Sequence, residues 1–329
     1  MRPLLVALLT TLVLGCVTPA PSDPAPDPAA AALDGLAPPT VDGARAREWW
    51  DAWVNAHPMR LAGSPTNIQA SEEIAAALAD AGYEARVLYY TPQGASPAAA
   101  GIRTIVGVKQ GTTQPDHVVG WLSHYDSTAS TIYAAYDDGS GTATTLEVAR
   151  ALAGYNNSKT LMAIFFDAEE LGLVASQAFV QQALQDESSV FDLVVGLDMT
   201  GINCPGHEWP LYGQPGKDHA EEILAAVKPA YAKAGLDVGE GEDATNCVVL
   251  LDANDRNSDE NSFREAGIPV LRFSGGRNAG DYPEYHKPGD TTQYVYDYMG
   301  GPENYEKGIA AAATATAWTV MAYDRQASG

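Results

Sequence analysis

The feature that most constrains the fold is an apolar run that stops abruptly at a cluster of acids. Residues 161–166 read Leu-Met-Ala-Ile-Phe-Phe and are followed closely by Asp167, Glu169 and Glu170. The run has the length of a strand, so it predicts a buried strand that carries acids at its end. Adjacent carboxylates repel each other unless a cation lies between them, which favours a metal. The same pair would also suit the positive end of a helix dipole, without any metal.

A second apolar run, residues 117–123, leads directly into His124, Tyr125 and Asp126. We expect it to be another buried strand. A carboxylate two residues after a histidine can hydrogen-bond the imidazole and fix its tautomer for a metal. A histidine at a strand end can also be a core or capping residue, but the nearby Asp126 favours the metal.

Two acids, Asp137 and Asp138, stand before Gly-Ser-Gly and a helix expected over residues 142–152. Acids at this position can simply cap the helix. Glycines also let the backbone approach a bound ion closely. The residues themselves therefore leave both interpretations open.

Two further strands are expected to end near groups that can bind a metal. Residues 191–197 lead into Asp198, and the strand expected at 268–273 precedes a loop that carries His286. The remaining expected elements are strands at 84–90 and 103–108 and helices at 43–57, 71–81, 171–184 and 304–323.

Strands that alternate with helices predict a single α/β domain with a mixed, mostly parallel sheet and helices on both faces. In open sheets of this kind, ligands bind at the carboxyl ends of the strands. Imidazoles and carboxylates without sulfur suit zinc, and six such groups exceed what one tetrahedral ion needs, so we expect two zinc ions. The six groups are His124, Asp137, Glu169, Glu170, Asp198 and His286.

The amino end has the pattern of an export signal. Arg2 precedes a short apolar run at residues 3–14, which is too short to span a bilayer stably. The following Gly15-Cys16 resembles the end of a bacterial lipoprotein signal, in which the cysteine is acylated. This predicts a signal peptide over residues 1–16 and lipidation at Cys16; ordinary secretion with a chance cysteine is the alternative.

Residues 17–39 are rich in proline and alanine, so we expect a disordered tether, followed by one domain over residues 40–329. The predicted location is the cell envelope, as a lipoprotein that faces the periplasm or the exterior, or the secreted fraction. A net charge of −23 excludes nucleic acid and anionic lipid surfaces as partners, so membrane contact is expected only through the lipid anchor.

Two cysteines, Cys204 and Cys247, remain after the signal. In an oxidising compartment they could form one disulfide across a long loop. Neither lies in a Cys-x-x-Cys spacing, so a thiolate zinc site is not expected.

Taken together, the motifs resemble those of the M28 family of zinc peptidases, in particular the bacterial co-catalytic aminopeptidases. The resemblance covers nearly the whole domain and implies a zinc-exopeptidase fold of the phosphorylase/hydrolase-like type. The motifs are Arg60-Leu-Ala-Gly-Ser-Pro, His124-Tyr-Asp-Ser, Asp137-Asp-Gly-Ser-Gly, Phe166-Asp-Ala-Glu-Glu-Leu-Gly-Leu, Leu197-Asp-Met and Tyr285-His.

The resemblance also implies a role for each of these positions. Asp137 would bridge two zinc ions, and its spacing to Gly141 favours it over Asp138. Glu169 would be the general base that acts on a water between the ions. The implied ligands are His124 and Asp198 for one ion and Glu170 and His286 for the other, with Asp126 orienting His124.

One motif departs from the family pattern. Many relatives have Ser-Asp-His near the last strand, whereas this chain has Ser258-Asp259-Glu260. Asp259 is expected to lie behind the metal ligands and to support them without binding the metal itself. Some relatives carry a tyrosine slightly upstream as an oxyanion donor, where Asp255 and Arg256 stand here.

The implied activity is that of a metallo-aminopeptidase, a hydrolase that acts on peptides with a free amino terminus. One alternative on the same fold is a glutaminyl-peptide cyclotransferase, which uses a single zinc. Another is a catalytically inactive surface binding module; relatives of that kind lose ligands, whereas this chain keeps every one.

Overall fold

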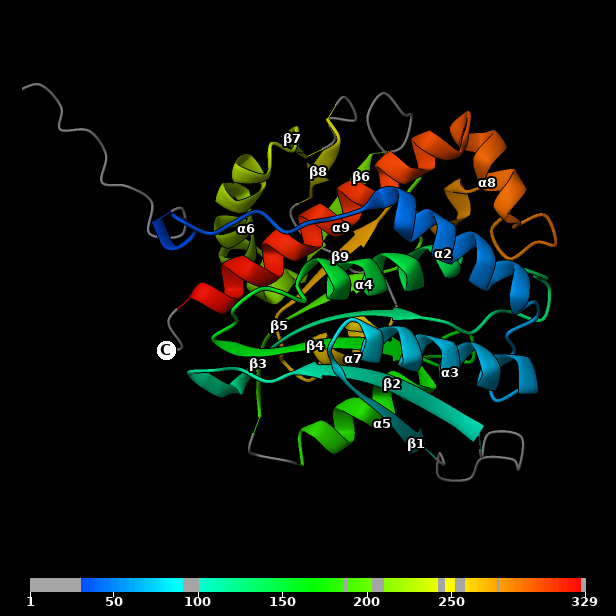
Figure 1. Ribbon diagram of the computed structural model, residues 1–329, viewed down its shortest axis with the longest axis horizontal. Helices are drawn as coiled ribbons and strands as arrows, with labels where there is room; N and C mark the ends of the chain where they lie inside the picture. Colours follow the sequence, from blue (N-terminus) through cyan, green and yellow to red (C-terminus); the bar gives the residue numbers. More distant parts are fainter. Residues whose placement is uncertain are drawn as a thin grey trace, which may run out of the picture.

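The computed structural model is drawn in Figure 1 and describes residues 31–90, 101–185, 189–202, 210–241, 246–251, 258–276 and 278–326. Within these ranges, the strands form a nine-stranded sheet with the order β1-β2-β4-β3-β5-β9-β6-β8-β7. The strands are β1 (Glu84–Tyr90), β2 (Ile102–Lys109), β3 (Gln114–His124), β4 (Lys159–Phe166), β5 (Val190–Leu197), β6 (Leu211–Pro215), β7 (Val238–Glu240), β8 (Val248–Leu250) and β9 (Val270–Ser274).

The centre of the sheet, β4-β3-β5-β9, is parallel throughout. Antiparallel pairs join β1 to β2, β2 to β4 and β6 to β9, while β6-β8-β7 is again parallel. The predicted mixed, mostly parallel sheet is therefore confirmed. Because the central strands run in one direction, their carboxyl ends meet at one edge.

Helices cover both faces of the sheet (Figure 1), as the sequence predicts. One hydrophobic core joins the sheet to the larger set of helices, and a smaller core lies under the two others. The larger set is α2 (Gly43–Ala56), α3 (Pro65–Asp80), α4 (Gly139–Ala151), α6 (Ala220–Ala234), α8 (Thr292–Met299) and α9 (Pro302–Arg325); the other face carries α5 (Val174–Ala183) and α7 (Glu260–Glu265).

Helices α3 and α5 are among those that begin at residues other than expected. α3 begins at Pro65 rather than residue 71, because Ser64 accepts a hydrogen bond from the Asn67 amide and proline suits the first turn. α5 begins at Val174 rather than residue 171, because Leu173 has a positive φ of 61° that interrupts the chain there. Residues 171–173, which were expected in the helix, instead belong to the turn that carries the two glutamates.

The packed part of the chain starts earlier than residue 40. Leu33 is buried in the larger core with 2% of its surface exposed, so the tether expected up to residue 39 ends before it. The predicted signal and Cys16 lie outside the described residues. Among the helices that the model describes, none combines the length and the hydropathy needed to cross a membrane.

Cys247, just before β8, is disulfide-bonded. Cys204 lies outside the described residues, so its pairing with Cys247 stays a prediction.

Candidate metal centre

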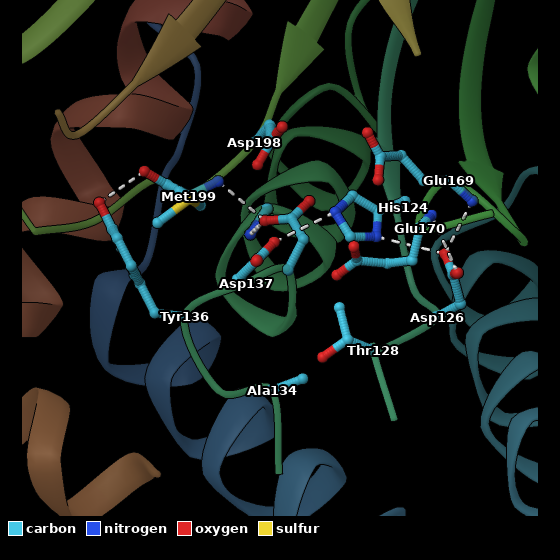
Figure 2. A network of polar contacts seen from close by, with 12 residues as sticks. His124, Asp126, Thr128, Ala134, Tyr136, Asp137, Glu169, Glu170, Asp198 and Met199 are labelled. Atoms are coloured by element: carbon cyan, nitrogen blue, oxygen red, sulfur yellow. Dashed lines mark hydrogen bonds and ion pairs between the residues drawn. The ribbon is translucent and has the colours of Figure 1, made fainter. Parts of the chain in front are cut away.

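The site lies at the carboxyl edge of the parallel strands, where several chain segments converge. β3 ends at His124, β4 ends just before Asp167, and β5 ends just before Asp198. His124 pairs in register with Phe166, so the loop that carries the two glutamates starts beside it. The sheet therefore brings together residues that are far apart in the sequence (Figure 2).

Among the described residues, three groups of three potential ligands lie close together. Asp137 belongs to two of them, which contain the five predicted ligands, and the third joins His124, Glu169 and Glu170. In one of its two groups Asp137 joins His124 and Asp198, and in the other it joins Glu170 and His286. Within each group, one potential ligand atom from each residue lies within 4.8 Å of the others. This is the arrangement expected of two ion sites that share a bridging carboxylate.

Asp137 lies between the two histidines. Its Oδ1 is 3.4 Å from His124 Nε2, and its Oδ2 is 3.1 Å from His286 Nε2. His286 Nε2 is also 3.2 Å from Glu170 Oε2. Each oxygen of Asp137 therefore faces a different half of the centre.

The two acids before α4 make different contacts, and only one of them caps the helix. Asp138 Oδ1 accepts hydrogen bonds from the amides of Gly141 and Met199, both at 2.9 Å, and thereby caps the helix. Its neighbour Asp137 is the acid that faces the histidines. A Cβ at Gly141 would overlap the Asp138 carboxylate and the Leu197 carbonyl, so only glycine fits.

Asp126 supports both His124 and the glutamates. Its Oδ1 lies 3.3 Å from His124 Nδ1, as the His-x-Asp spacing predicts. It also accepts the amide hydrogens of Glu169 and Glu170, at 3.1 and 3.3 Å. These amide contacts, which the sequence did not reveal, tie the predicted base and one predicted ligand to the same buried carboxylate.

The backbone is strained at three positions next to predicted site residues. Ala168, Met199 and His286 have φ values of 58°, 56° and 54°. Such values cost a non-glycine residue on the order of 1–3 kcal/mol and cluster at functional sites. Strain beside Glu169, beside Asp198 and at His286 itself is consistent with side chains that are held for chemistry.

The electrostatics of the centre favour a cation. Burial raises the pKa of Glu169 well above its usual range and also raises that of Glu170. Hydrogen bonds to Asp137 and Glu170 raise the pKa of His286 to about 10. Metal binding requires deprotonated ligands, so a cation would displace these protons and offset the repulsion among the carboxylates.

The donor set fits zinc. Asp198 Oδ1 and Glu170 Oε1 are buried and have no hydrogen-bond partner among the described residues. Buried carboxylate oxygens of this kind normally bind a donor or a metal. Two imidazoles and three carboxylates without sulfur are ligands that zinc accepts.

The predicted ligands other than Glu170 border a cavity of about 260 Å³. Glu169 reaches this cavity, although it belongs to neither group that contains Asp137. Further lining residues that the sequence analysis did not identify are Met199, Arg272, Asn278, Ala279 and Tyr285.

Asp259, predicted behind the ligands, is completely buried immediately before α7. Burial raises the pKa of its carboxyl, and its charge in turn raises the pKa of Glu169. Asp259 is therefore close enough to the predicted base to influence it. Asp255 and Arg256 lie outside the described residues.

Two residues with polar contacts at the centre were missed by the sequence analysis. Asp290 accepts hydrogen bonds from the amides of Tyr136 and Asp137, at 2.9 and 3.1 Å. Arg272 donates to Asp198 Oδ2 at 2.7 Å. A detectable signal existed for Arg272, because it is the only charged residue in the apolar run 268–273.

Comparison with known proteins agrees with this geometry. The family model described as peptidase family M28 matches residues 104–300. Aminopeptidase YwaD from Bacillus subtilis is 29% identical over 197 residues, which cover 59% of this chain and 40% of that protein. The chain therefore spans less than half of the length of this relative.

Solved structures share the fold. BSAP, a zinc aminopeptidase from Bacillus subtilis, superimposes with a TM-score of 0.65 at 18% identity and covers 84% of this chain and 94% of its own. The glutaminyl cyclase from Fimbriiglobus ruber has a TM-score of 0.67 at 17% identity, with coverages of 87% and 97%. Because the family model matches more than half of the chain, the protein belongs to peptidase family M28.

Proposed function

We propose that the protein is a zinc-dependent exopeptidase, and specifically an aminopeptidase. The observation that carries this proposal is the pair of three-residue groups that share Asp137, with Glu169 beside them in the same cavity. Sequence similarity to an aminopeptidase from Bacillus subtilis supports the same activity.

Two zinc ions held by these groups would polarise the scissile carbonyl and acidify a water molecule. The protein's own residues supply the proton transfer. Glu169 takes a proton from the attacking water and delivers it to the leaving amine, with its backbone held by Asp126. Asp126 also fixes the His124 ring, so one carboxylate sets the relative positions of base and ligand.

The charge of the cavity supports exopeptidase activity. Among its described lining residues, Met199 and Tyr285 stand beside the carboxylates. The carboxylates along its wall would attract the positive charge of a free amino terminus. Peptides with a free amino terminus are therefore the proposed substrates.

The decisive experiment combines zinc analysis with kinetics on the purified protein. We expect about two zinc ions per chain by mass spectrometry, hydrolysis of aminoacyl-nitroanilides, and loss of activity on chelation that zinc restores. Profiling a mixed peptide library would then identify the preferred terminal residue. A zinc-loaded protein that releases no amino-terminal residue from any peptide in the library would refute the proposal.

Glutaminyl-peptide cyclotransferase is the second candidate, because a glutaminyl cyclase shares the fold. Ammonia release from a peptide with amino-terminal glutamine, together with one zinc per chain, would identify that activity. Neither peptide hydrolysis nor ammonia release would instead identify an inactive binding module.

We also propose export with acylation at Cys16, on the strength of the amino-terminal sequence. In the producing bacterium, mass spectrometry of the mature protein should find an acylated Cys16 at the amino terminus. A Cys16→Ala variant should lose the lipid label, and labelling that persists in this variant would contradict the proposal.

A further inference from the structure

We propose that Arg272 is a positioning residue of the metal centre, which holds Asp198 by one carboxylate oxygen and leaves the other for the metal. Glu260 is the counter-ion of this arginine. The inference rests on the proposed metallopeptidase function, but it concerns residues to which neither the family motifs nor the predicted ligand set assigns a role.

The sheet fixes Arg272 beside the ligand. Arg272 on β9 is paired in register with Gly196 on β5, and Asp198 follows two residues later. The Arg272 side chain lines the cavity, although only 5% of it is exposed. Strand pairing therefore fixes the backbone of Arg272 beside Asp198, and burial restricts the rotamers that its side chain can adopt.

The contact divides the two oxygens of the Asp198 carboxylate. Arg272 Nη2 lies 2.7 Å from Oδ2, which is the distance of a strong charge-assisted hydrogen bond. The other oxygen, Oδ1, is buried without a hydrogen-bond partner among the described residues. A guanidinium on Oδ2 opposes a cation there and directs metal binding to Oδ1.

Glu260 explains the departure from the family's Ser-Asp-His motif. It stands where many relatives have histidine, is 1% exposed, and places Oε1 3.9 Å from Arg272 Nη1. Gly196 provides the room, since a Cβ there would lie 2.9 Å from Glu260 Oε2. Glycine, glutamate and arginine at these three positions are therefore complementary in both shape and charge.

A buried arginine beside a metal would weaken cation binding unless its charge were balanced. Glu260 supplies that balance from the side of Arg272 that faces α7. The pair adds no net charge, yet it keeps one guanidinium nitrogen on Asp198 Oδ2. A variant in which Arg272 and Glu260 are both neutral therefore separates the two roles. Its net charge at the site is unchanged, so only the loss of positioning could weaken zinc binding.

The test is the double variant Arg272→Met with Glu260→Gln, which removes one positive and one negative charge. Zinc affinities of the apoprotein are measured by competition with a chromophoric chelator, alongside kcat and KM. We expect one of the two zinc ions to bind at least tenfold more weakly and kcat to fall at least tenfold, with KM nearly unchanged. Wild-type affinity for both ions in a folded double variant would overturn the proposal.

Arg272→Lys provides an independent test if the double variant fails to fold. Lysine keeps the charge but lacks the planar guanidinium, whose Nη2 reaches Asp198 while its Nη1 faces Glu260. Positioning therefore predicts weaker binding of the same zinc ion, whereas charge compensation predicts no change. Unchanged zinc affinity in this variant would also overturn the proposal.

The matched control is Arg264→Met on α7, because Arg264 donates to Asn261 and does not line the cavity. It should retain both zinc affinities. Failure of the proposed function would appear separately, as a wild-type protein that does not bind two zinc ions.

Discussion

Both ends of the central strands carry charged residues with little exposure, but the partners of these residues differ. At the amino end, Lys159 at the start of β4 places Nζ 2.5 Å from Asp192 Oδ2, and His117 lies 2.8 Å from the other oxygen. At the carboxyl end, Glu170 Oε1 and Asp198 Oδ1 have no hydrogen-bond partner among the described residues.

Asp324, near the end of α9, extends the contrast. Its carboxylate accepts the amides of Ser158 and Lys159 and the hydroxyl of Tyr155, at distances between 2.7 and 3.2 Å. The amino end therefore pairs its acids with cations and donors of the protein, although Asp192 Oδ2 makes only the ion pair with Lys159 and no hydrogen bond within the described part of the chain. The carboxyl end leaves for a ligand oxygen atoms that have neither a cation nor a donor among the described residues. Unsatisfied buried acids, rather than buried acids as such, mark the functional site.

The largest expected effect is that of Asp137→Ala at the carboxyl end. Removing the residue that both groups share should abolish activity and lower the zinc content. Zinc should raise the melting temperature of wild-type apoprotein, because it binds the native state, and should have little effect on the variant. Two zinc ions bound to Asp137→Ala with wild-type affinity would contradict the shared-ligand assignment.

Glu169→Gln should keep both zinc ions but reduce turnover roughly a thousandfold, since the amide cannot accept the proton. Metal analysis and kinetics on aminoacyl-nitroanilides check this. Glu73→Gln is a suitable control, because Glu73 pairs with His57 away from the cavity. Wild-type turnover in Glu169→Gln would refute the role of the base.

Lys159→Met at the amino end should lower the free energy of unfolding by roughly 3 kcal/mol, because it leaves a largely buried carboxylate without its cation. Zinc content and kcat should stay at wild-type values. Chemical denaturation measures the stability, and a loss of zinc would break the proposed division between the two ends.

Asp324→Asn should have the smallest effect, a loss of about 1 kcal/mol, because the amide keeps one acceptor and loses part of the hydrogen-bonding to the backbone. Chemical denaturation is again the measurement, with unchanged activity expected. A change in kcat would show that the amino end influences the chemistry.

Much of the fold was predictable because strands and helices leave local signals. The apolar runs before His124, Asp167 and Asp198 identified the central strands, and their common direction placed those residues at one edge. The predicted start of α5 was wrong, because Leu173 adopts a left-handed conformation and the helix begins only after it. Such a conformation has no reliable signal in the sequence.

The candidate ligands could be proposed from the sequence because each lies in a short motif. The contacts that support them could not be predicted. The hydrogen bonds of Asp126 to two amides, and those of Asp290 to the backbone before Asp137, join residues separated by 43 positions or more. A side chain that accepts hydrogen bonds from the backbone of a distant segment leaves no periodicity or spacing pattern in the sequence.

The sequence by itself determined the strand ends and the types of donor they carry, and hence the class of metal that they would suit, because hydrophobic patterning and ligand chemistry are local properties. The family resemblance already implied Asp137 rather than Asp138 as the shared ligand. Only the tertiary structure decided the contacts of these two acids and placed Arg272 and Glu260 behind Asp198. The reason is physical: strand register and close packing act between residues that are remote in the chain, and only the folded sheet brings them into contact.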